Sequence, residues 1–280
     1  MKEILLCLEP TTPSMAHVRA AAWAAALQGA RLTVLFVQPE RDIPLAVRLQ
    51  MKDVDRVLAL SDREIADKAR DLTAAAVQPA GVGYHWVEAA GLAEEIMVRR
   101  SRTTDLAVVA LPSREGNKGA DEPGADPLIG PLVMHSGRPI LAVPANAAIT
   151  SFGRRVVVCW DGGRECSRAL HDALPILQKA KSVDLLMVVH QLSEGDGEPI
   201  EFGSSVRSHL AQHGVSAEAR AVALPVGRGV DDLLLDWAEN NAADLIVMGA
   251  FGRSRLREIV LGSVTHGVIS RSRIPVLLSH

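Results

Sequence analysis

Short aliphatic runs alternate with longer amphipathic segments along the whole of this 280-residue chain. In the second half the aliphatic runs predict strands at 154–160, 183–189, 217–223, 243–248 and 274–278. Segments with a helical period predict helices between them, at 164–181, 199–213, 229–241 and 263–271. The third of these helices has apolar residues at i, i+3, i+4, i+7 and i+8, which form one face: Val230, Leu233, Leu234, Trp237 and Ala238.

The first half shows the same alternation. Its aliphatic runs predict strands near 3–8, 32–37, 82–88, 105–110 and 139–143. A long helix is expected at about 50–76, with these residues facing inward: Val54, Val57, Leu58, Ile65, Ala69 and Leu72. Strands that alternate with helices through right-handed crossovers form a parallel sheet covered on both faces. The pattern therefore predicts an α/β protein with two tandem, doubly wound, parallel five-stranded sheets.

The two halves resemble each other in sequence. Residues 4–9 align with 156–161, which places cysteine on cysteine and acid on acid. Two further pairs follow in the same order, 105–110 with 244–249 and 138–144 with 273–278. Three matches in one order indicate a tandem duplication. We therefore expect one domain at 1–146 and a second at 153–280, joined by a linker at about 144–153.

Composition and charge restrict the classes of function. The chain is 48% hydrophobic but only 3% aromatic, so its cores must be built from aliphatic side chains. A net charge of −3 and few aromatic rings give no basis for binding nucleic acid. No apolar run is long enough for a membrane span or a secretory leader. The three cysteines, Cys7, Cys159 and Cys166, lack disulfide or zinc spacing, so a reduced cytoplasmic location is expected.

The most informative motif follows the fourth predicted strand of the second half. It has the pattern G-2x-G-9x-G-S, formed by Gly249, Gly252 and 262–263. The first two glycines let the backbone turn and approach a ligand closely, because they carry no Cβ. Gly262 and Ser263 open a helix whose free N–H groups and dipole favour an anion.

Other residues near this motif add to the predicted anion site. Ser263 suits an N-cap position, and Ser263 and Thr265 carry hydroxyl donors for a phosphate. Arg253, Arg255 and Arg257 supply positive charge in the connecting loop. The motif lies at the carboxyl ends of parallel strands, where open α/β sheets bind their ligands. The sequence therefore predicts phosphate binding at this edge of the sheet.

The second half, about 125 residues, resembles the ATP-binding branch of the universal stress protein family. The resemblance rests on the glycine motif, on the first-strand sequence Val158-Cys159-Trp160-Asp161-Gly162, and on the closing 272–277. It implies a Rossmann-like fold of the adenine-nucleotide alpha-hydrolase-like type, with ATP or another adenine nucleotide as the ligand. Mg²⁺ would be held by the phosphates.

The resemblance also assigns roles to individual residues. Asp161 would contact the nucleotide near its ribose or phosphates, and Val189 would lie against adenine. Met248, Gly249 and Gly252 would line the pocket, and the ribose and phosphates would be held by Gly262, Ser263, Val264 and Thr265. The last strand commonly forms the family's dimer interface, so either a homodimer or an intramolecular pseudo-dimer is expected. Two simpler readings stay open: Asp161 caps the next helix, and Val189 is a core residue.

The first half departs from this pattern. At the matching place it has neither early glycine, and Pro112 lacks the N–H that a phosphate cradle needs. The inserted segment carries Asp121, Glu122 and Asp126, which repel phosphate, and Asp126-Pro127 is expected to begin the last helix. Pro10 follows Glu9 where the second half has a glycine. We read this half as a degenerate copy that does not bind nucleotide.

Other chemistry has weaker support. There is no G-x-G-x-x-G after the first strand and no G-x-x-x-x-G-K-[ST]. The nine histidines are dispersed without metal-ligand spacing, although His266 and His190 lie near the predicted site. Cys166 is expected to be the more exposed thiol. The favoured function is an ATP-dependent regulator, with an unknown protein partner and at most slow hydrolysis or self-phosphorylation, and the alternative is a nucleotide-free scaffold.

Overall fold

The computed structural model describes residues 1–10, 15–39, 53–111, 128–189, 197–251 and 262–280. Side chains are described in these ranges except at 54–57 and 197–202. Within them, every strand predicted from the sequence is present, with its ends displaced by no more than two residues.

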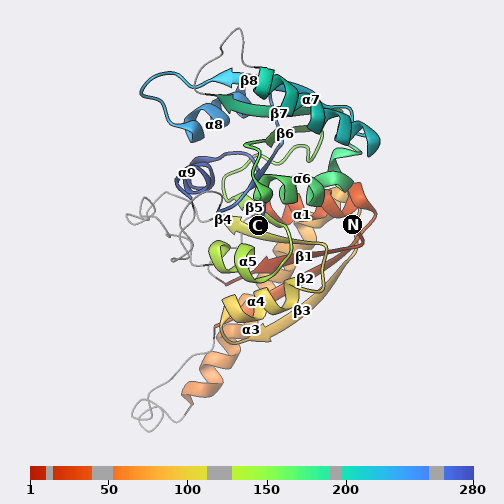
Figure 1. Ribbon diagram of the computed structural model, residues 1–280. Coiled ribbons are helices and arrows are strands. Elements are labelled where there is room, and N and C mark those ends of the chain that lie inside the picture. The colour runs from red at the N-terminus through yellow and green to blue at the C-terminus, as the bar shows by residue number, and fades with distance from the viewer. Residues whose placement is uncertain (11–14, 40–52, 112–127, 190–196, 252–261) are drawn as a thin grey trace.

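The elements alternate as expected (Figure 1). The first half contains, in order, β1 (Glu3–Leu8), α1 (Met15–Gln28), β2 (Arg31–Gln38), α3 (Val54–Val77), the 3-10 turn η1 (Gln78–Ala80), β3 (Tyr84–Ala90), α4 (Ala93–Ser101), β4 (Leu106–Leu111), α5 (Ile129–His135) and β5 (Ile140–Pro144). The second half contains β6 (Arg155–Cys159), α6 (Arg164–Leu177), β7 (Ser182–Val189), α7 (Gly197–Gln212), β8 (Glu218–Ala223), α8 (Val230–Asn240), β9 (Leu245–Gly249), α9 (Ser263–Arg271) and β10 (Val276–Ser279).

The strands form one continuous sheet, in the order β3-β2-β1-β4-β5-β10-β9-β6-β7-β8. Within each half all strand pairs are parallel. The halves meet where β5 pairs with β10 in antiparallel orientation. The two sheets expected from the sequence are therefore joined through their last strands, which is the intramolecular pseudo-dimer.

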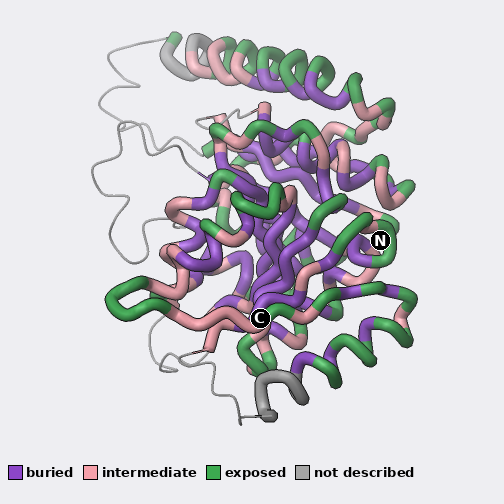
Figure 2. The backbone as a smooth tube through the Cα atoms, turned by 90° about the horizontal axis from the view of Figure 1, so that it is seen from above, coloured by how far each residue is buried: buried purple, intermediate pink, exposed green. Residues whose placement is uncertain are grey.

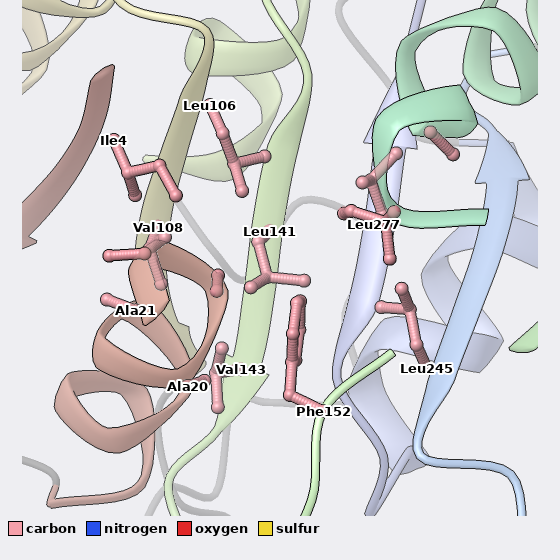
Figure 3. Close-up of a cluster of buried hydrophobic side chains, with 14 of the residues drawn as sticks. Ile4, Ala20, Ala21, Leu106, Val108, Leu141, Val143, Phe152, Leu245 and Leu277 are labelled. Atoms are coloured by element: carbon pink, nitrogen blue, oxygen red, sulfur yellow. The ribbon is translucent and has the colours of Figure 1, made fainter. Parts of the chain in front are cut away.

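The hydrophobic core continues across this junction. Leu141 lies opposite Leu277 in the register, and both side chains are fully buried. Figure 3 shows both residues in one cluster with Val108 of the first half and Leu245 of the second. Figure 2 shows buried backbone running through the middle of the molecule, with exposed residues on the outer helices. Because side chains from both halves share one core, the halves pack as one unit.

Helices α1 and α6 add polar contacts between the halves. The Gln28 amide donates a hydrogen bond to the carbonyl of Pro175 at 2.9 Å, and Lys179 Nζ donates to the carbonyl of Leu27 at 2.5 Å. These bonds bring the carboxyl-terminal ends of the two helices together over one face of the junction.

Equivalent aspartates fix the start of the first strand in each half. Asp105 accepts hydrogen bonds from the backbone N–H groups of Lys2 and Glu3. Asp244 accepts them from Arg154 and Arg155, at 2.9 and 3.0 Å. The aspartates that align in the repeat thus share a structural role, joining the beginnings of neighbouring strands.

The inward face of α3 differs from the prediction. Ala69 is buried as expected, but Leu72 is 41% exposed, and the neighbouring Thr73 is buried in its place. Thr73 satisfies its hydroxyl by donating to the carbonyl of Ala69 at 2.7 Å. Because a threonine can satisfy its hydroxyl within its own helix, apolar periodicity alone misplaced this face.

Candidate functional site

A pocket of about 530 Å³ opens at the carboxyl ends of β6, β7 and β9. Helix α8 and the beginnings of α6 and α9 complete its wall. The lining residues are Cys159, Trp160, Asp161, Glu165, Cys166, Leu186, Val188, Val230, Leu234, Met248, Gly249, Gly262, Ser263, Val264 and Thr265. A cavity of this size falls within the usual range for small-molecule sites, about 300–1,000 Å³.

The amino end of α9 offers unpaired backbone donors to this pocket. Gly262 is the N-cap residue and supplies no side chain, and the first helical bond is donated by His266 N–H to the Gly262 carbonyl. In the described part of the chain, the amides of Ser263, Val264 and Thr265 have no acceptor, and all three residues line the pocket. Ser263 was predicted to be the N-cap, but it is the first helical residue. Without a capping side chain, these amides remain available to an anion.

Gly249 is required by packing between protein segments. A Cβ at this position would lie 2.5 Å from the backbone nitrogen of Cys166 and 2.6 Å from the carbonyl carbon of Glu165. The glycine therefore lets the end of β9 approach the first turn of α6. From the sequence, the absence of a side chain at this position was expected to let a ligand approach closely. The close neighbours that the structure describes are instead residues of α6.

Asp161 contacts the start of α6 and also lies at the pocket wall. Its carboxylate accepts a hydrogen bond from the N–H of Gly163, the N-cap residue of α6, at 2.8 Å. The same residue lines the pocket. Between them, Gly162 has a positive φ of 78°, which glycine adopts without strain. Asp161 therefore organises the start of α6 while remaining at the pocket wall.

The described lining is acidic. Asp161 and Glu165 both contribute carboxylates, and the lining within the described ranges contains no lysine, arginine or histidine. Burial raises the pKa of Glu165, but Arg164, which pairs with it at 2.6 Å, acts together with the backbone N–H of Glu165 and the charge of His280 to hold the pKa below its usual value. Glu165 is thus a stable anion at neutral pH. An anionic ligand in this pocket needs compensation from backbone amides or from a cation.

Two thiols lie in the pocket wall, and both are buried. Burial raises the pKa of Cys159 and of Cys166 to about 12. Cys166 was predicted to be the more exposed thiol, and this is wrong: it lies in the first turn of α6 and donates to the carbonyl of Gly163 at 3.0 Å. Both groups are neutral thiols at physiological pH and are poor nucleophiles.

Strand β7 lines the pocket through residues other than Val189, the residue that the family resemblance placed against adenine. Leu186 and Val188 of β7 line the pocket, whereas Val189 is not among the lining residues. Successive side chains of a strand point to opposite faces, so a shift of one position changes the face. Met248 lines the pocket as expected, while Gly252, Arg253 and His190 lie outside the described residues, as do Pro112, Asp126 and Pro127.

Several lining residues were not singled out from the sequence. Val230 and Leu234 belong to the apolar face predicted for α8. The helical periodicity predicts that they face the protein interior, but it does not distinguish a core residue from a residue that lines a pocket. Trp160 and Glu165 lie close in sequence to Asp161, which was predicted to be a site residue. This closeness was the feature of the sequence that could have identified them as lining residues.

The backbone is strained just beyond Gly249. Phe251 has a φ of 65°, which is unusual for a residue with a side chain. Its ring packs edge-on against His280, with centroids 5.7 Å apart, and His280 Nδ1 lies 3.1 Å from the carbonyl of Ala250. The end of β10 therefore supports the segment that leaves β9 at the pocket.

The corresponding end of the first half differs. Ala110 occupies the position that aligns with Gly249. A hollow of about 10 Å³ lies beside Glu9 between α1 and α3, on the face of the sheet opposite to that of the pocket in the second half. This is about the space of one water molecule.

The histidines are less dispersed than the sequence indicated. The rings of His171 on α6 and His209 on α7 lie 5.2 Å apart, and His213 lies 4.7 Å from His209. None of the three lines the pocket. Among the described residues, no group of three or more His, Cys, Asp or Glu side chains is arranged to hold a metal ion. Within the same described ranges, no helix has the length and hydropathy of a membrane span.

Fold and site together define a duplicated α/β protein with an open ligand pocket in its second half. Residues 153–280 match the universal stress protein family. The universal stress protein Slr1230 of Synechocystis sp. is 24% identical to this chain, over an alignment that covers 99% of both. The family match thus lies in the second half, and the similarity to Slr1230 extends over the full chain, which fits a tandem form.

Two further similarities concern a short stretch and the whole fold. A 41-residue stretch is 51% identical to the universal stress protein MJ0577 of Methanocaldococcus jannaschii, and it covers 15% of this chain and 25% of that one. The crystal structure of a universal stress protein from Archaeoglobus fulgidus superposes with a TM-score of 0.70 at 19% identity. That superposition covers 99% of this chain and 97% of the other, so the fold extends over both halves.

Proposed function

We propose that this protein binds one adenine nucleotide, ATP, in the pocket of its second half and acts as a nucleotide-dependent regulator. The observation that carries the proposal is that the amides of Ser263, Val264 and Thr265 have no acceptor among the described residues and lie at a cavity of about 530 Å³. Amides at a helix amino terminus bind phosphate oxygens through hydrogen bonds and the helix dipole. The apolar wall of Leu186, Val188 and Leu234 is suited to the adenine ring.

The acidic lining supports a role for Mg²⁺. Asp161 and Glu165 would repel a bare polyphosphate, and a divalent cation carried by the phosphates reduces that repulsion. The ribose, which is neutral, fits the Asp161 side of the pocket better than phosphate does. The phosphates would then lie at the amino end of α9.

The domain at 153–280 would hold the single site, and the domain at 1–146 would be the degenerate copy. Ala110 in place of a glycine supports this division. Among the described residues, the pocket lining offers buried, neutral thiols and no histidine, which favours a regulator over a rapid ATPase. At most slow hydrolysis or self-phosphorylation is expected.

Equilibrium titration with ATP, with and without Mg²⁺, tests the proposal. Ser263→Pro is the decisive variant because proline is well tolerated at the first helical position and deletes one amide donor. The preceding Gly262 has ψ of 145°, which is the conformation that a residue before proline prefers. We expect ATP affinity to fall about tenfold, which corresponds to one charged hydrogen bond.

Ser263→Ala is the matched control, since it keeps the amide and removes only the hydroxyl. Its affinity for ATP should stay within about threefold of the wild type, the scale of a weak neutral hydrogen bond. No ATP binding at millimolar concentration, or equal binding by Ser263→Pro and the wild type, would leave the nucleotide-free scaffold as the better account.

A further inference from the structure

Helices α8 and α9 together frame one side of the pocket. Val230 and Leu234 reach it from α8, and 263–265 reach it from the amino end of α9. The position of α9 against α8 therefore decides where its free amides lie relative to the rest of the pocket. None of the residues that fix this position belongs to the glycine motif.

Arg271, in the last turn of α9, forms ion pairs with two consecutive carboxylates of α8. Its Nη2 contacts Asp231 and its Nη1 contacts Asp232. Its Nε also donates to the carbonyl of Gly267 at 3.2 Å, one turn back on its own helix. The side chain of Arg271 is 33% exposed and that of Asp231 is 22% exposed, so this pair is partly shielded from solvent, whereas Asp232 is 44% exposed.

Gly267 makes this approach sterically feasible. A Cβ at Gly267 would lie 2.7 Å from Cγ and 3.0 Å from Cβ of Asp231, and would overlap its carboxylate. Glycine inside a helix lowers helix stability, so its presence in α9 has a packing reason. The Asp231 carboxylate occupies the space that a side chain at 267 would fill.

A simpler role for these charges is helix-end stabilisation. Asp231 and Asp232 lie in the first turn of α8, and Arg271 lies in the last turn of α9, where each sign is favourable to its own helix dipole. That role accounts for the presence of the three charges. It does not explain the glycine at position 267, or why Arg271 lies in contact with both aspartates. A test must therefore separate helix stability from ligand geometry.

We propose that Arg271, held by Asp231 and Asp232 beside Gly267, is a positioning residue that fixes the amino end of α9 for the anionic part of the ligand. This inference rests on the proposed nucleotide function. It gives a specific expectation: loosening the cluster weakens binding of the phosphates and leaves binding of the nucleoside nearly unchanged. Leu186 and Val188 of β7, and Asp161 after β6, belong to elements that the cluster does not contact.

Calorimetric titration of the full chain with ATP and with adenosine tests this inference. Arg271→Gln removes both ion pairs, and Gly267→Ala displaces the Asp231 carboxylate. Each should weaken ATP binding about tenfold, on the scale of one charged hydrogen bond, with adenosine affinity changed less than about twofold. Arg271→Lys retains one charge and should restore part of the ATP affinity.

Arg31→Gln is the matched control because it breaks a comparable ion pair, Arg31 with Glu3 at 3.2 Å, in the first half. It should change neither affinity. Thermal unfolding of each variant identifies the temperature range in which the protein is folded. If Arg271→Gln does not fold, Asp232→Asn, at a more exposed position, removes one ion pair and should show a smaller change in the same direction.

The results separate this inference from the proposed function. Loss of thermal stability with unchanged ATP affinity would show a helix-end role and overturn the inference alone. Equal weakening of ATP and adenosine would show general collapse of the pocket, and it would overturn the inference as well. Failure of the wild type to bind ATP would overturn both the inference and the proposed function.

Discussion

Leu141 and Leu277 face each other at the centre of the antiparallel pairing between β5 and β10, and neither side chain is exposed to solvent. They come from equivalent strands of the two halves and belong to one continuous core. The contact explains how two similar units became one folded body.

Truncation of either leucine should destabilise the whole chain. We expect Leu277→Ala to lower the free energy of unfolding by about 2–5 kcal/mol, since it removes buried contacts and leaves a cavity. Leu141→Ala should have a similar effect, and the double variant should lose less than the sum because the two cavities merge. Denaturant unfolding measures these values. Leu92→Ala, at a 68% exposed position, is the control and should stay within about 0.5 kcal/mol of the wild type.

The Asp105 carboxylate should make stability depend on pH. The backbone N–H of Lys2, more than any other group, lowers the pKa of Asp105 below its ordinary value of 3.8, against the opposing effect of burial. A lowered pKa gives stability that is present above pH 3.8 and lost as the pH falls toward the folded-state value. Asp105→Asn should therefore be less stable than the wild type at pH 7 and should lose less stability between pH 5 and pH 3. Equal pH dependence of the two proteins would contradict this role.

Gly249→Ala should disturb both the fold and the site. The new Cβ would meet the backbone of Glu165 and Cys166, which cannot move away as a flexible side chain could. We expect a loss of about 1–3 kcal/mol in unfolding free energy, together with weaker ATP binding, as the start of α6 is displaced. Gly83→Ala offers a matched control, because a Cβ there has no neighbour within 4 Å. Indistinguishable stabilities for the two variants would show that the close approach at Gly249 is not required.

The three cysteines should resist alkylation in the folded protein. Cys7, Cys159 and Cys166 are buried, and burial raises the pKa of each to about 12. Because the thiolate is the reactive form, iodoacetamide at pH 8 should modify none of them within minutes. All three should react in denaturant. Mass spectrometry gives the count, and rapid native labelling of Cys166 would show that the first turn of α6 opens.

The sequence predicted the strands well because buried parallel strands are continuous aliphatic runs with polar ends. The duplicated Asp105 and Asp244 were visible in the alignment, although their hydrogen bonds to strand beginnings were not. The pairing of β5 with β10 was expected only through the family resemblance, since apolar strand sequences do not specify their partners.

Errors arose where a choice between neighbouring positions depended on tertiary contacts. Val188 and Val189 are equally apolar, so the sequence does not distinguish them. In the strand their side chains point to opposite faces of the sheet, and only Val188 lines the pocket. Cys166 follows a polar loop, yet the close approach of β9 buries it. Leu72 was predicted to be a core residue because it is apolar. The sequence does not show that the hydroxyl of Thr73 is hydrogen-bonded within its own helix, which allows Thr73 to be buried.

The joining of β5 to β10 inside one chain has a consequence for how the two units change over time. In a symmetric homodimer every substitution occurs in both subunits, so a change that harms a ligand site harms both copies. In a single chain the two units can differ, as Ala110 differs from the aligned Gly249. The covalent tether thereby releases the protein from symmetry and lets one unit specialise without its partner.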